Sequence, residues 1–285
     1  MYIGKISDFI SNYKNYEIKD FIQILEHSNV KKFDKSKFEK DFLLTLILVK
    51  FWEKYPDLIF KWWTCLNKIY FPYFRLSEDL DFVINKDIGR TARKTLLKKY
   101  EEDFVSDLSI LWLKLREERT KYDEYRLAMF TFEYKSILDD SLQTIKIDIS
   151  LKNKLYLPTF SREIKSNFKD IFLEENIFWT HFINSIDLRE SLAEKMRAAL
   201  TRWKPAIRDF FDIWHVREFS DFNFKDEEFK KLVNIKLQEV DYNYSLEENF
   251  EKLKKQVKTD LKPVLNQDFE FDFENIYDFI LSFKK

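Results

Sequence analysis

Two aspartates in one short segment are the residues of this chain best placed to do chemistry. Asp79 and Asp81 lie two residues apart in SEDLDF (77–82), a segment that we expect to form a strand. Side chains alternate between the faces of a strand, so both carboxylates point to one side and Leu80 and Phe82 to the other. Two adjacent negative charges repel each other and favour a cation between them. Two carboxylates together with substrate phosphates suit Mg2+, which binds oxygen at about 2.1 Å and keeps several waters.

A third carboxylate lies on the polar side of another alternating segment. In TIKIDIS (144–150) the three isoleucines point to one side, and Asp148 points to the other. If this strand lies beside the strand of Asp79 and Asp81, three carboxylates can hold two metals about 3.5–4 Å apart. That arrangement activates an attacking hydroxyl and stabilises a leaving pyrophosphate.

The elements that must position these aspartates follow from hydrophobic periodicity and from the prolines. We expect short helices in Met1–Asn29 and a helical chain from about Ser161 to the C-terminus, where Ser245–Glu248 is a capping box. The other expected helices are Lys35–Lys54, Thr64–Tyr70, Ile88–Leu115, Arg189–Leu200, Ile207–Arg217 and Phe273–Phe283. The expected strands are Leu58–Phe60, Asp79–Ile84, Arg126–Lys135 and Thr144–Ser150, with a loop at Leu138–Ser141.

Composition limits the classes to which the protein can belong. Its 285 residues, 45% of them hydrophobic, suffice for one large domain or two small ones. The single cysteine, Cys65, excludes an internal disulfide and fits a reducing cytosol. The longest apolar run, Phe42–Val49, is too short to span a bilayer, and the N-terminus shows no signal-peptide pattern. We therefore expect a cytoplasmic protein without a membrane segment.

The net charge of −1 gives no overall attraction to nucleic acid, so any such contact must be local. Arg90, Lys94 and Lys98 follow one another at four-residue spacing and form one basic stripe on the expected helix. A solvated helix face explains most such runs, and we favour it here. The alternative is a contact to RNA phosphates, which requires position as well as charge.

The segments around the aspartates resemble the active-site core of the AbiEii/AbiGii family of nucleotidyltransferase toxins. Arg75–Phe82 (RLSEDLDF) matches the family pattern Arg-x-Ser-Glu-Asp-Leu-Asp-Phe in full. The preceding family pattern, Phe-Lys-Gly-Gly-Thr/Ser, corresponds to Phe60–Thr64 (FKWWT), in which Trp62 and Trp63 replace the two glycines.

A second block, later in the chain, extends this resemblance. Glu194–Arg202 (EKMRAALTR) matches Glu-Lys-x-x-Ala-x-x-x-Arg, and Arg208–Asp212 (RDFFD) matches Arg-Asp-x-x-Asp after a proline. The motifs lie between about Lys35 and Val216, and their order together with Asp148 makes a chance match improbable. Taken alone, Lys195 and Arg202 would be surface charges on an amphipathic helix, and Arg208 and Asp212 a helical ion pair.

The resemblance implies an α+β fold with a small mixed β-sheet of the nucleotidyltransferase type, flanked by helices. It implies a nucleotidyltransferase core with N-terminal helices at 1–160 and a helical C-terminal domain at 161–285. The implied activity is Mg2+-dependent transfer of NMP from an NTP to an RNA acceptor, such as a tRNA 3′ end. The implied role is the toxin of a toxin–antitoxin or phage-defence pair, whose antitoxin acts without obligate stable binding to the toxin.

The resemblance also assigns roles to single residues. Asp79 and Asp81 would bind the metals, and Asp148 would complete the metal site and orient the acceptor hydroxyl. Lys195 would neutralise the triphosphate, and Asp212 would support that lysine or the metal site. Three further residues are expected phosphate contacts beside Thr64, which would donate its hydroxyl or its backbone N–H at a helix N-terminus. They are Lys61, Arg75 and Ser77.

Trp62 and Trp63 leave three alternatives open. Glycine lets the backbone approach phosphates closely and adopt a positive φ, and we expect tryptophan to remove both freedoms. The loop is then rebuilt with a tryptophan stacked on a base, or the pocket is blocked in a non-catalytic binding relative, or the nucleotide sits differently. Transfer of NMP to a protein side chain is a further possibility, because the same carboxylates would serve. The retained charge cluster favours activity.

Overall fold

The computed structural model divides the chain into two compact units, Met1–Ile186 and Asp187–Lys285. The structure describes residues 18–30, 33–52, 54–152, 154–169, 174–178, 180–240, 246–265 and 270–284.

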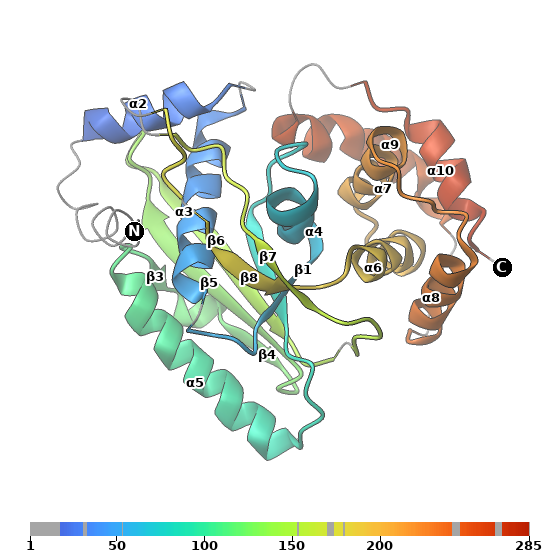
Figure 1. The fold of residues 1–285 in the computed structure, drawn as a ribbon, viewed down its shortest axis with the longest axis horizontal. Coiled ribbons are helices and arrows are strands. Elements are labelled where there is room, and N and C mark those ends of the chain that lie inside the picture. Colours follow the sequence, from blue (N-terminus) through green and yellow to red (C-terminus); the bar gives the residue numbers. More distant parts are fainter. Residues whose placement is uncertain are drawn as a thin grey trace. The chain divides into compact units, whose positions relative to one another are not determined.

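The first unit is built on one mixed sheet (Figure 1). Its strands in the described residues are β1 Ile59–Lys61, β2 Asp79–Val83, β3 Lys114–Leu115, β4 Lys121–Asp123, β5 Leu127–Lys135, β6 Leu142–Ser150, β7 Phe160–Glu163 and β8 Phe182–Ser185. They lie in the order β3-β5-β6-β2-β1-β8-β7, and β4 pairs with β5. The pairs β2–β6 and β1–β8 are parallel, and the others are antiparallel. The expected mixed sheet flanked by helices is therefore confirmed.

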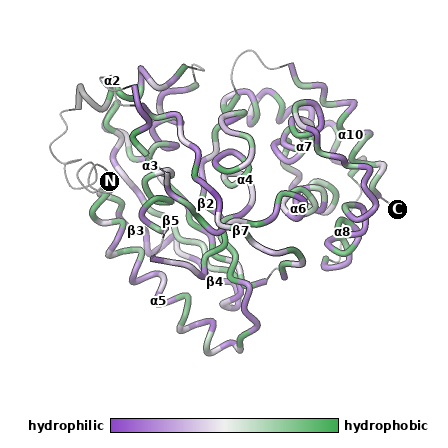
Figure 2. Tube along the Cα trace, viewed as in Figure 1, coloured by the Kyte–Doolittle hydropathy of each residue, from purple (hydrophilic) through white to green (hydrophobic). Residues whose placement is uncertain are grey.

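Two long helices cover the apolar face of the sheet. They are α3 (Lys35–Phe51) and α5 (Arg90–Ser109), and the unit also contains α2 (Ile18–Ser28) and the single turn η2 (Glu117–Arg119). The ring of Phe51 lies 5.8 Å from Phe82 of β2 and 4.5 Å from Phe104 of α5, and Phe104 lies 5.7 Å from Phe130 of β5. Figure 2 shows hydrophobic and hydrophilic residues alternating along α5, as expected of a helix that buries one side.

A short helix joins β1 to the loop before β2. It begins as α4 (Trp62–Cys65) and continues as the π-helical segment η1 (Leu66–Tyr70). Lys68, fully buried, fixes this helix to α3 by donating to Asp41 at 2.6 Å and to Thr45 at 2.9 Å. The helix thereby holds the residues after β1 against the core.

The second unit is helical in its described residues. Its elements are α6 Leu188–Thr201, α7 Ile207–Phe219, α8 Glu227–Gln238, η3 Glu247–Asn249, α9 Phe250–Gln256, η4 Val257–Leu261, η5 Lys262–Val264 and α10 Phe273–Leu281. Aspartates cap three of the helices, since Asp187, Asp226 and Asp272 accept hydrogen bonds from backbone N–H groups of the first turns of α6, α8 and α10. Aromatic rings from α7, α9 and α10 form the core, with Phe250 and Tyr277 4.8 Å apart.

The prediction of a continuously helical chain from Ser161 is wrong, because Phe160–Glu163 and Phe182–Ser185 are strands. Each is only four residues long, and each is stabilised by pairing with a distant segment, which hydrophobic periodicity does not report. These strands extend the sheet beyond residue 160, so the first compact unit ends at Ile186 rather than at the expected boundary. Ser245 of the expected capping box and residues 1–17 lie outside the described residues.

The helix expected to reach Leu115 ends at Ser109. Trp112 has φ 56° and reverses the chain there. Backbone hydrogen bonds run from Leu113 N–H to the Leu108 carbonyl (3.1 Å) and from Trp112 N–H to the Ser109 carbonyl (3.0 Å). This is the pattern of a Schellman cap, in which glycine usually occupies the left-handed position. A tryptophan at that position gives no stop signal in the sequence.

Candidate active site

The central carboxylates come from two neighbouring strands. Asp81 of β2 lies directly opposite Asp148 of β6 in the parallel pairing, and Asp79 lies opposite Lys146. Paired strands are about 4.8 Å apart, and paired residues point to the same face. The adjacency of the three aspartates, which was a hypothesis from sequence, is confirmed.

Asp148 is the least compensated of the three. Its Oδ1 atom is buried and has no hydrogen-bond partner in the part of the chain that the structure describes. Burial, reinforced by the charge of Asp79, raises the pKa of Asp148 to about 6, although Lys146 and Lys61 act in the opposite direction. A buried carboxylate oxygen without a donor is a strong site for a cation.

Lys61 places a positive charge beside these acids. It lies opposite Asp81 in the antiparallel pairing of β1 with β2, and only 4% of the residue is exposed. Its Nζ lies 4.9 Å from the ring centre of Trp62, a cation–π distance. The candidate phosphate contact expected at Lys61 is thus on the same face as the carboxylates.

The loop after β1 keeps a conformation that normally belongs to glycine. Trp62 has φ 60°, which costs a residue with a Cβ about 1–2 kcal/mol. The expectation that tryptophan would remove the positive φ is therefore wrong. Trp63 is helical, and its ring lies 4.8 Å from the guanidinium of Arg75. Both indoles are half-buried, each beside a cation.

Thr64, Arg75 and Ser77 are buried and bonded within the protein. Thr64 Oγ1 shares a 2.7 Å hydrogen bond with Ser77 Oγ and donates to the carbonyl oxygen of Asp79. Arg75 donates to the carbonyl of Leu76 at 2.9 Å. These contacts connect the first turn of α4 to the start of β2, and so fix the loop relative to Asp79.

Glu78 anchors the same motif to α3, a role that the sequence did not predict. It accepts from Lys37 at 3.0 Å and from Lys40 at 3.3 Å. Burial raises the pKa of Glu78, but the hydrogen bond from Lys37 and the charges of both lysines outweigh it and hold the pKa at about 2. The sequence feature that could have indicated this contact is the presence of two lysines, Lys37 and Lys40, one turn apart on α3.

In the helical unit the predicted lysine and aspartate are brought together. Lys195 of α6 donates to Asp212 of α7 at 2.9 Å and lies 3.8 Å from Asp209, which in turn pairs with Arg202 at 2.9 Å. Lys195 is 3% exposed, so it is not a surface charge on an amphipathic helix. The hydrogen bond fits one of the two roles that the resemblance implied for Asp212, support of Lys195 or of the metal site, and both roles stay predictions.

A second buried charge network in this unit was not predicted from the sequence. Lys236 of α8 lies 2.8 Å from Glu190 and 3.4 Å from Glu194, both on α6, and all three side chains are almost fully buried. The signal available was that Lys236 lies four residues after Leu232, on the apolar side of its helix. The two predicted groups, Asp79–Asp81–Asp148 and Lys195–Asp212, thus belong to different units, and each is assembled within its own.

The acidic residues of this site suit Mg2+ that is also bound by substrate phosphates, rather than a metal ion bound by protein side chains alone. In the described ranges, no group of three or more His, Cys, Asp or Glu side chains is arranged to hold a metal ion. Mg2+ is commonly held by one or two carboxylates together with substrate phosphates. Asp81 and Asp148, with the unpartnered Oδ1, supply that number of carboxylates.

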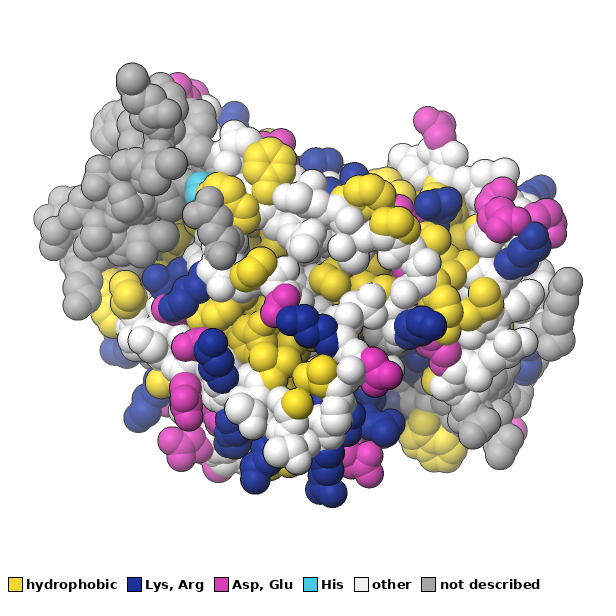
Figure 3. All heavy atoms as spheres, turned by 60° about the horizontal axis from the view of Figure 1, so that its bottom comes forward, with side chains coloured by type: hydrophobic (Ala, Val, Ile, Leu, Met, Phe, Trp, Pro, Cys, Tyr) yellow, Lys and Arg dark blue, Asp and Glu magenta, His cyan; other side chains and the backbone are white. Residues whose placement is uncertain are grey.

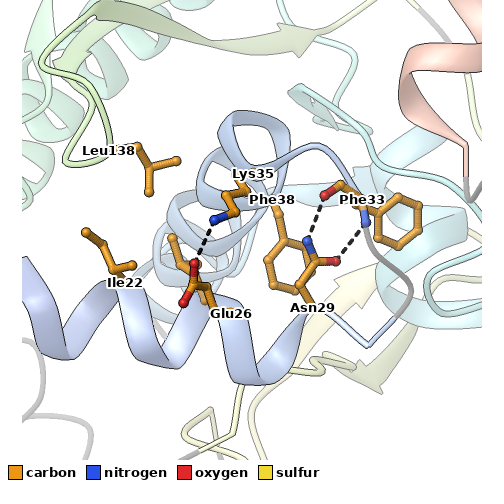
Figure 4. A pocket seen from close by; sticks show the side chains of 8 residues that line it. Ile22, Glu26, Asn29, Phe33, Lys35, Phe38 and Leu138 are labelled. Atoms are coloured by element: carbon orange, nitrogen blue, oxygen red, sulfur yellow. Dashed lines mark hydrogen bonds and ion pairs between the residues drawn. The ribbon is translucent and has the colours of Figure 1, made fainter.

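A separate cavity of about 330 Å3 lies beside α2 and α3 (Figure 4). Its polar groups are already engaged with one another: Lys35 donates to Glu26 at 2.6 Å, and Asn29 bonds to the backbone of Phe33. Most of its lining is apolar, so it offers no site for phosphoryl chemistry. The lining residues are Ile22, Leu25, Glu26, Asn29, Phe33, Lys35, Phe38 and Leu138.

Comparison with known proteins confirms the resemblance drawn from the motifs. A sequence model of the family "Nucleotidyl transferase AbiEii toxin, Type IV TA system" matches residues 53–279. No curated protein sequence matches the chain. JHP933 from Helicobacter pylori shares the fold, with a TM-score of 0.51 and 18% identity over 88% of this chain and 91% of that protein. A second H. pylori protein, provisionally designated a nucleotidyltransferase, has a TM-score of 0.51 and 16% identity over 88% and 93%.

In the described part of the chain, no helix is both long enough and apolar enough to cross a bilayer.

Proposed function

The chain belongs to the AbiEii family of nucleotidyl transferase toxins of type IV toxin–antitoxin systems, and we propose that it transfers NMP from an NTP to an RNA acceptor in a Mg2+-dependent reaction. A tRNA 3′ end is the acceptor that we put forward. The protein would act in the cytoplasm as a toxin, and its antitoxin would counteract it without stable binding.

The observation that carries this proposal is the pairing of Asp81 with Asp148 across two parallel strands. One buried oxygen of Asp148 has no hydrogen-bond partner in the described residues, and its pKa is raised to about 6. Uncompensated buried charge lowers stability, so its presence at the expected site favours binding of a cation over a structural role.

The three aspartates have distinct tasks in this proposal. Asp81 and Asp148 would hold Mg2+ together with the substrate phosphates, whose charge the ion would neutralise, and Asp79 would add negative charge beside them. Asp148 would also accept a hydrogen bond from the acceptor hydroxyl and orient its oxygen towards the α-phosphate. The hydroxyl oxygen would bond to the α-phosphorus as the bond from this phosphorus to the bridging oxygen breaks. The hydroxyl proton would pass by way of Asp148 to solvent, and pyrophosphate would leave.

Cationic groups would bind the triphosphate. Lys195 carries three N–H donors, of which Asp212 engages one and thereby sets the direction of the ammonium. Lys61 and the backbone N–H of Thr64 are proposed as further phosphate contacts. Arg75 and Ser77 are buried, and we assign them to holding this loop in place.

The left-handed conformation of Trp62 favours a working loop over a blocked one. The backbone follows the path that glycine would take, so backbone N–H groups keep the direction they have in a glycine loop. The indole of Trp62 then provides a flat surface for a nucleobase. A blocked, non-catalytic relative remains the rival, and NMP transfer to protein is a second rival.

The test is incubation of the purified protein with total RNA, Mg2+ and each labelled NTP in turn. We expect label in RNA with the natural chain and with Asp221→Asn, which removes an exposed carboxylate elsewhere. Asp81→Asn should lose at least 100-fold of the rate. Label in protein rather than RNA would select the second rival. No NTP binding by the natural chain, with binding gained by Trp62→Gly/Trp63→Gly, would select the blocked relative.

A further inference from the structure

Helix α5 carries its charges in an order that opposes its own dipole. The first ten residues (90–99) contain five cations and no carboxylate, and the next ten (100–109) contain four carboxylates and no cation. Helix termini favour the reverse, with anions at the N-terminus and cations at the C-terminus. The first turn also lacks a side-chain cap, since Gly89 occupies the N-cap position. The order is therefore not explained by stabilisation of the helix.

Three cations at this end of the first unit have no carboxylate to neutralise them. Arg90, Lys94 and Arg126 are exposed and form no ion pair within the described part of the chain. Their neighbours Lys86 and Lys152 differ, because Asp57 pairs with the first at 2.6 Å and Asp123 pairs with the second.

Contacts between elements bring these cations onto one surface. Lys94 Nζ lies 5.7 Å from the ring centre of Tyr125, at the tip of the β4–β5 hairpin. The carbonyl of the adjacent Arg126 accepts a 2.7 Å hydrogen bond from Leu151 N–H, at the end of β6. We call Arg90, Lys94, Tyr125 and Arg126 the α5–hairpin surface. Figure 3, which turns the lower side of Figure 1 forward, shows many Lys and Arg side chains along its lower part, with Asp and Glu side chains among them.

The hairpin holds Tyr125 in a position that usually favours glycine. Arg126 N–H donates to the Asp123 carbonyl at 2.8 Å, and the two central residues, Glu124 and Tyr125, have φ 49° and 55°. A two-residue turn of this kind prefers Asn-Gly. The turn therefore presents a half-buried aromatic ring between two unpaired cations, at a conformational cost.

We propose that the α5–hairpin surface binds the phosphodiester backbone of a single-stranded nucleic acid, with Tyr125 stacking on a base. Unpaired cations spaced along one surface, with an aromatic ring between them, are the recognition elements for single strands. This reverses the preference for a solvated helix face that the basic stripe alone supported.

The position of this surface connects it to the carboxylates. Ser150 lies opposite Leu127 in the β5–β6 pairing and only two residues beyond Asp148, which is about 7 Å along the strand. Arg126 thus lies near the end of β6, and a strand bound there would have to pass this end of the sheet to reach Asp148, which lies on the face opposite to α5. The identification of the bound strand as the acceptor rests on the proposed function.

The test is binding of a fluorescein-labelled single-stranded RNA, in EDTA and without NTP, to the natural chain and to R90E/K94E/R126E. The variant should bind about tenfold or more weakly at about 50 mM salt. The slope of log Kd against log salt concentration should fall by about 2, or about 0.7 for each lost contact. The matched control K225E/K255E/K258E makes the same charge change at exposed lysines that have no ion pair among the described residues, and should bind as the natural chain does.

Tyr125→Gly is the second variant, because glycine accepts the positive φ while the ring is lost. It should leave the melting temperature unchanged or higher and weaken RNA binding about fivefold or more. Unchanged binding by both variants, no RNA binding by the natural chain, or binding only to anionic phospholipid vesicles would overturn the proposal. If the variants lose RNA binding but the natural chain transfers no NMP, the proposed function is rejected and the RNA-binding surface is kept. If the natural chain transfers NMP to RNA but the variants bind RNA as well as it does, the proposed function is kept and the RNA-binding surface is rejected.

Discussion

Buried acids are handled in opposite ways in the two units. In the helical unit, Lys236 lies between Glu190 and Glu194, and Lys195 donates to Asp212. On the sheet, Asp148 has a buried oxygen that no group in the described residues satisfies, and Asp79 adds a second negative charge. Paired buried charges fix how elements pack. An unpaired charge on a strand face lowers stability and serves binding. We therefore assign a structural role to Lys236 with Glu190 and Glu194, and a chemical role to Asp148.

The largest expected effect comes from breaking the buried network of the helical unit. Lys236→Met removes the cation from between two buried carboxylates and should lower the free energy of unfolding by about 3–5 kcal/mol, measured by urea denaturation. Adding Glu190→Gln and Glu194→Gln removes the stranded charges and should restore most of that loss. A loss below 1 kcal/mol for the single variant would contradict the assignment of this network to structure.

On the sheet, removing a charged group should raise the free energy of unfolding instead of lowering it. Asp148→Asn removes an uncompensated charge and should raise the free energy of unfolding at pH 7 by about 1–3 kcal/mol in buffer with EDTA. The folded-state pKa, about 6, lies above the ordinary value of 3.8, so the folded protein holds a proton that the unfolded chain releases. The contribution of Asp148 to stability therefore falls as pH rises from about 4 to about 6, and stays lost above.

The fall in stability between about pH 4 and pH 6 should be absent from Asp148→Asn, which is the control for the pH effect. Urea denaturation at several pH values between 4 and 7 measures it. A variant less stable than the natural chain at pH 7 would show that Asp148 has a stabilising partner, and the contrast between the two units would fail.

Substitutions at Trp62 and Trp63, in the loop after β1, should have smaller effects on stability but test the backbone conformation directly. Trp62→Gly and Trp62→Ala both remove the indole, but only glycine suits φ 60°, so the glycine variant should be more stable by about 1 kcal/mol. At Trp63, which is helical, alanine should be more stable than glycine by about 0.5–1 kcal/mol. Melting temperatures of the four variants measure both differences. Equal signs at the two positions would mean that Trp62 does not hold the left-handed conformation.

A similarly small effect is expected at Glu78, a partly exposed acid that does have partners. Glu78→Gln weakens the contacts to Lys37 and Lys40 and should lower the free energy of unfolding at pH 6 by about 1 kcal/mol. Because its folded-state pKa is lowered to about 2, the contribution is complete above the ordinary value of 4.5 and is lost as pH falls from there to about 2. A constant difference between variant and natural chain over pH 2–6 would contradict this account.

Sequence reasoning succeeded where the information was local. Alternation along β2 and β6 placed Asp79, Asp81 and Asp148 on one face, and the motif spacing joined Lys195 with Asp212. It failed for β7 and β8, whose pairing partners are distant, and for Lys236, whose partners depend on how α8 packs on α6.

The sequence also failed to predict where the backbone adopts positive φ. The chain has only two glycines, and Trp62, Trp112 and Tyr125 adopt positive φ in places where glycine would be expected. Residue type therefore gives no sign of these turns, and the tryptophan at 62 led to the wrong expectation that the positive φ would be lost.

The most direct test of the central claim, that Asp81 and Asp148 form a cation site that acts with an NTP, is binding of Mn2+ as a substitute for Mg2+. Electron paramagnetic resonance counts the free ion with a non-hydrolysable NTP present and needs no acceptor. The account predicts tight binding by the natural chain and by Asp221→Asn, and at least a tenfold weaker affinity for Asp148→Asn. Equal affinity in all three proteins would show that the carboxylate pair is not the metal site.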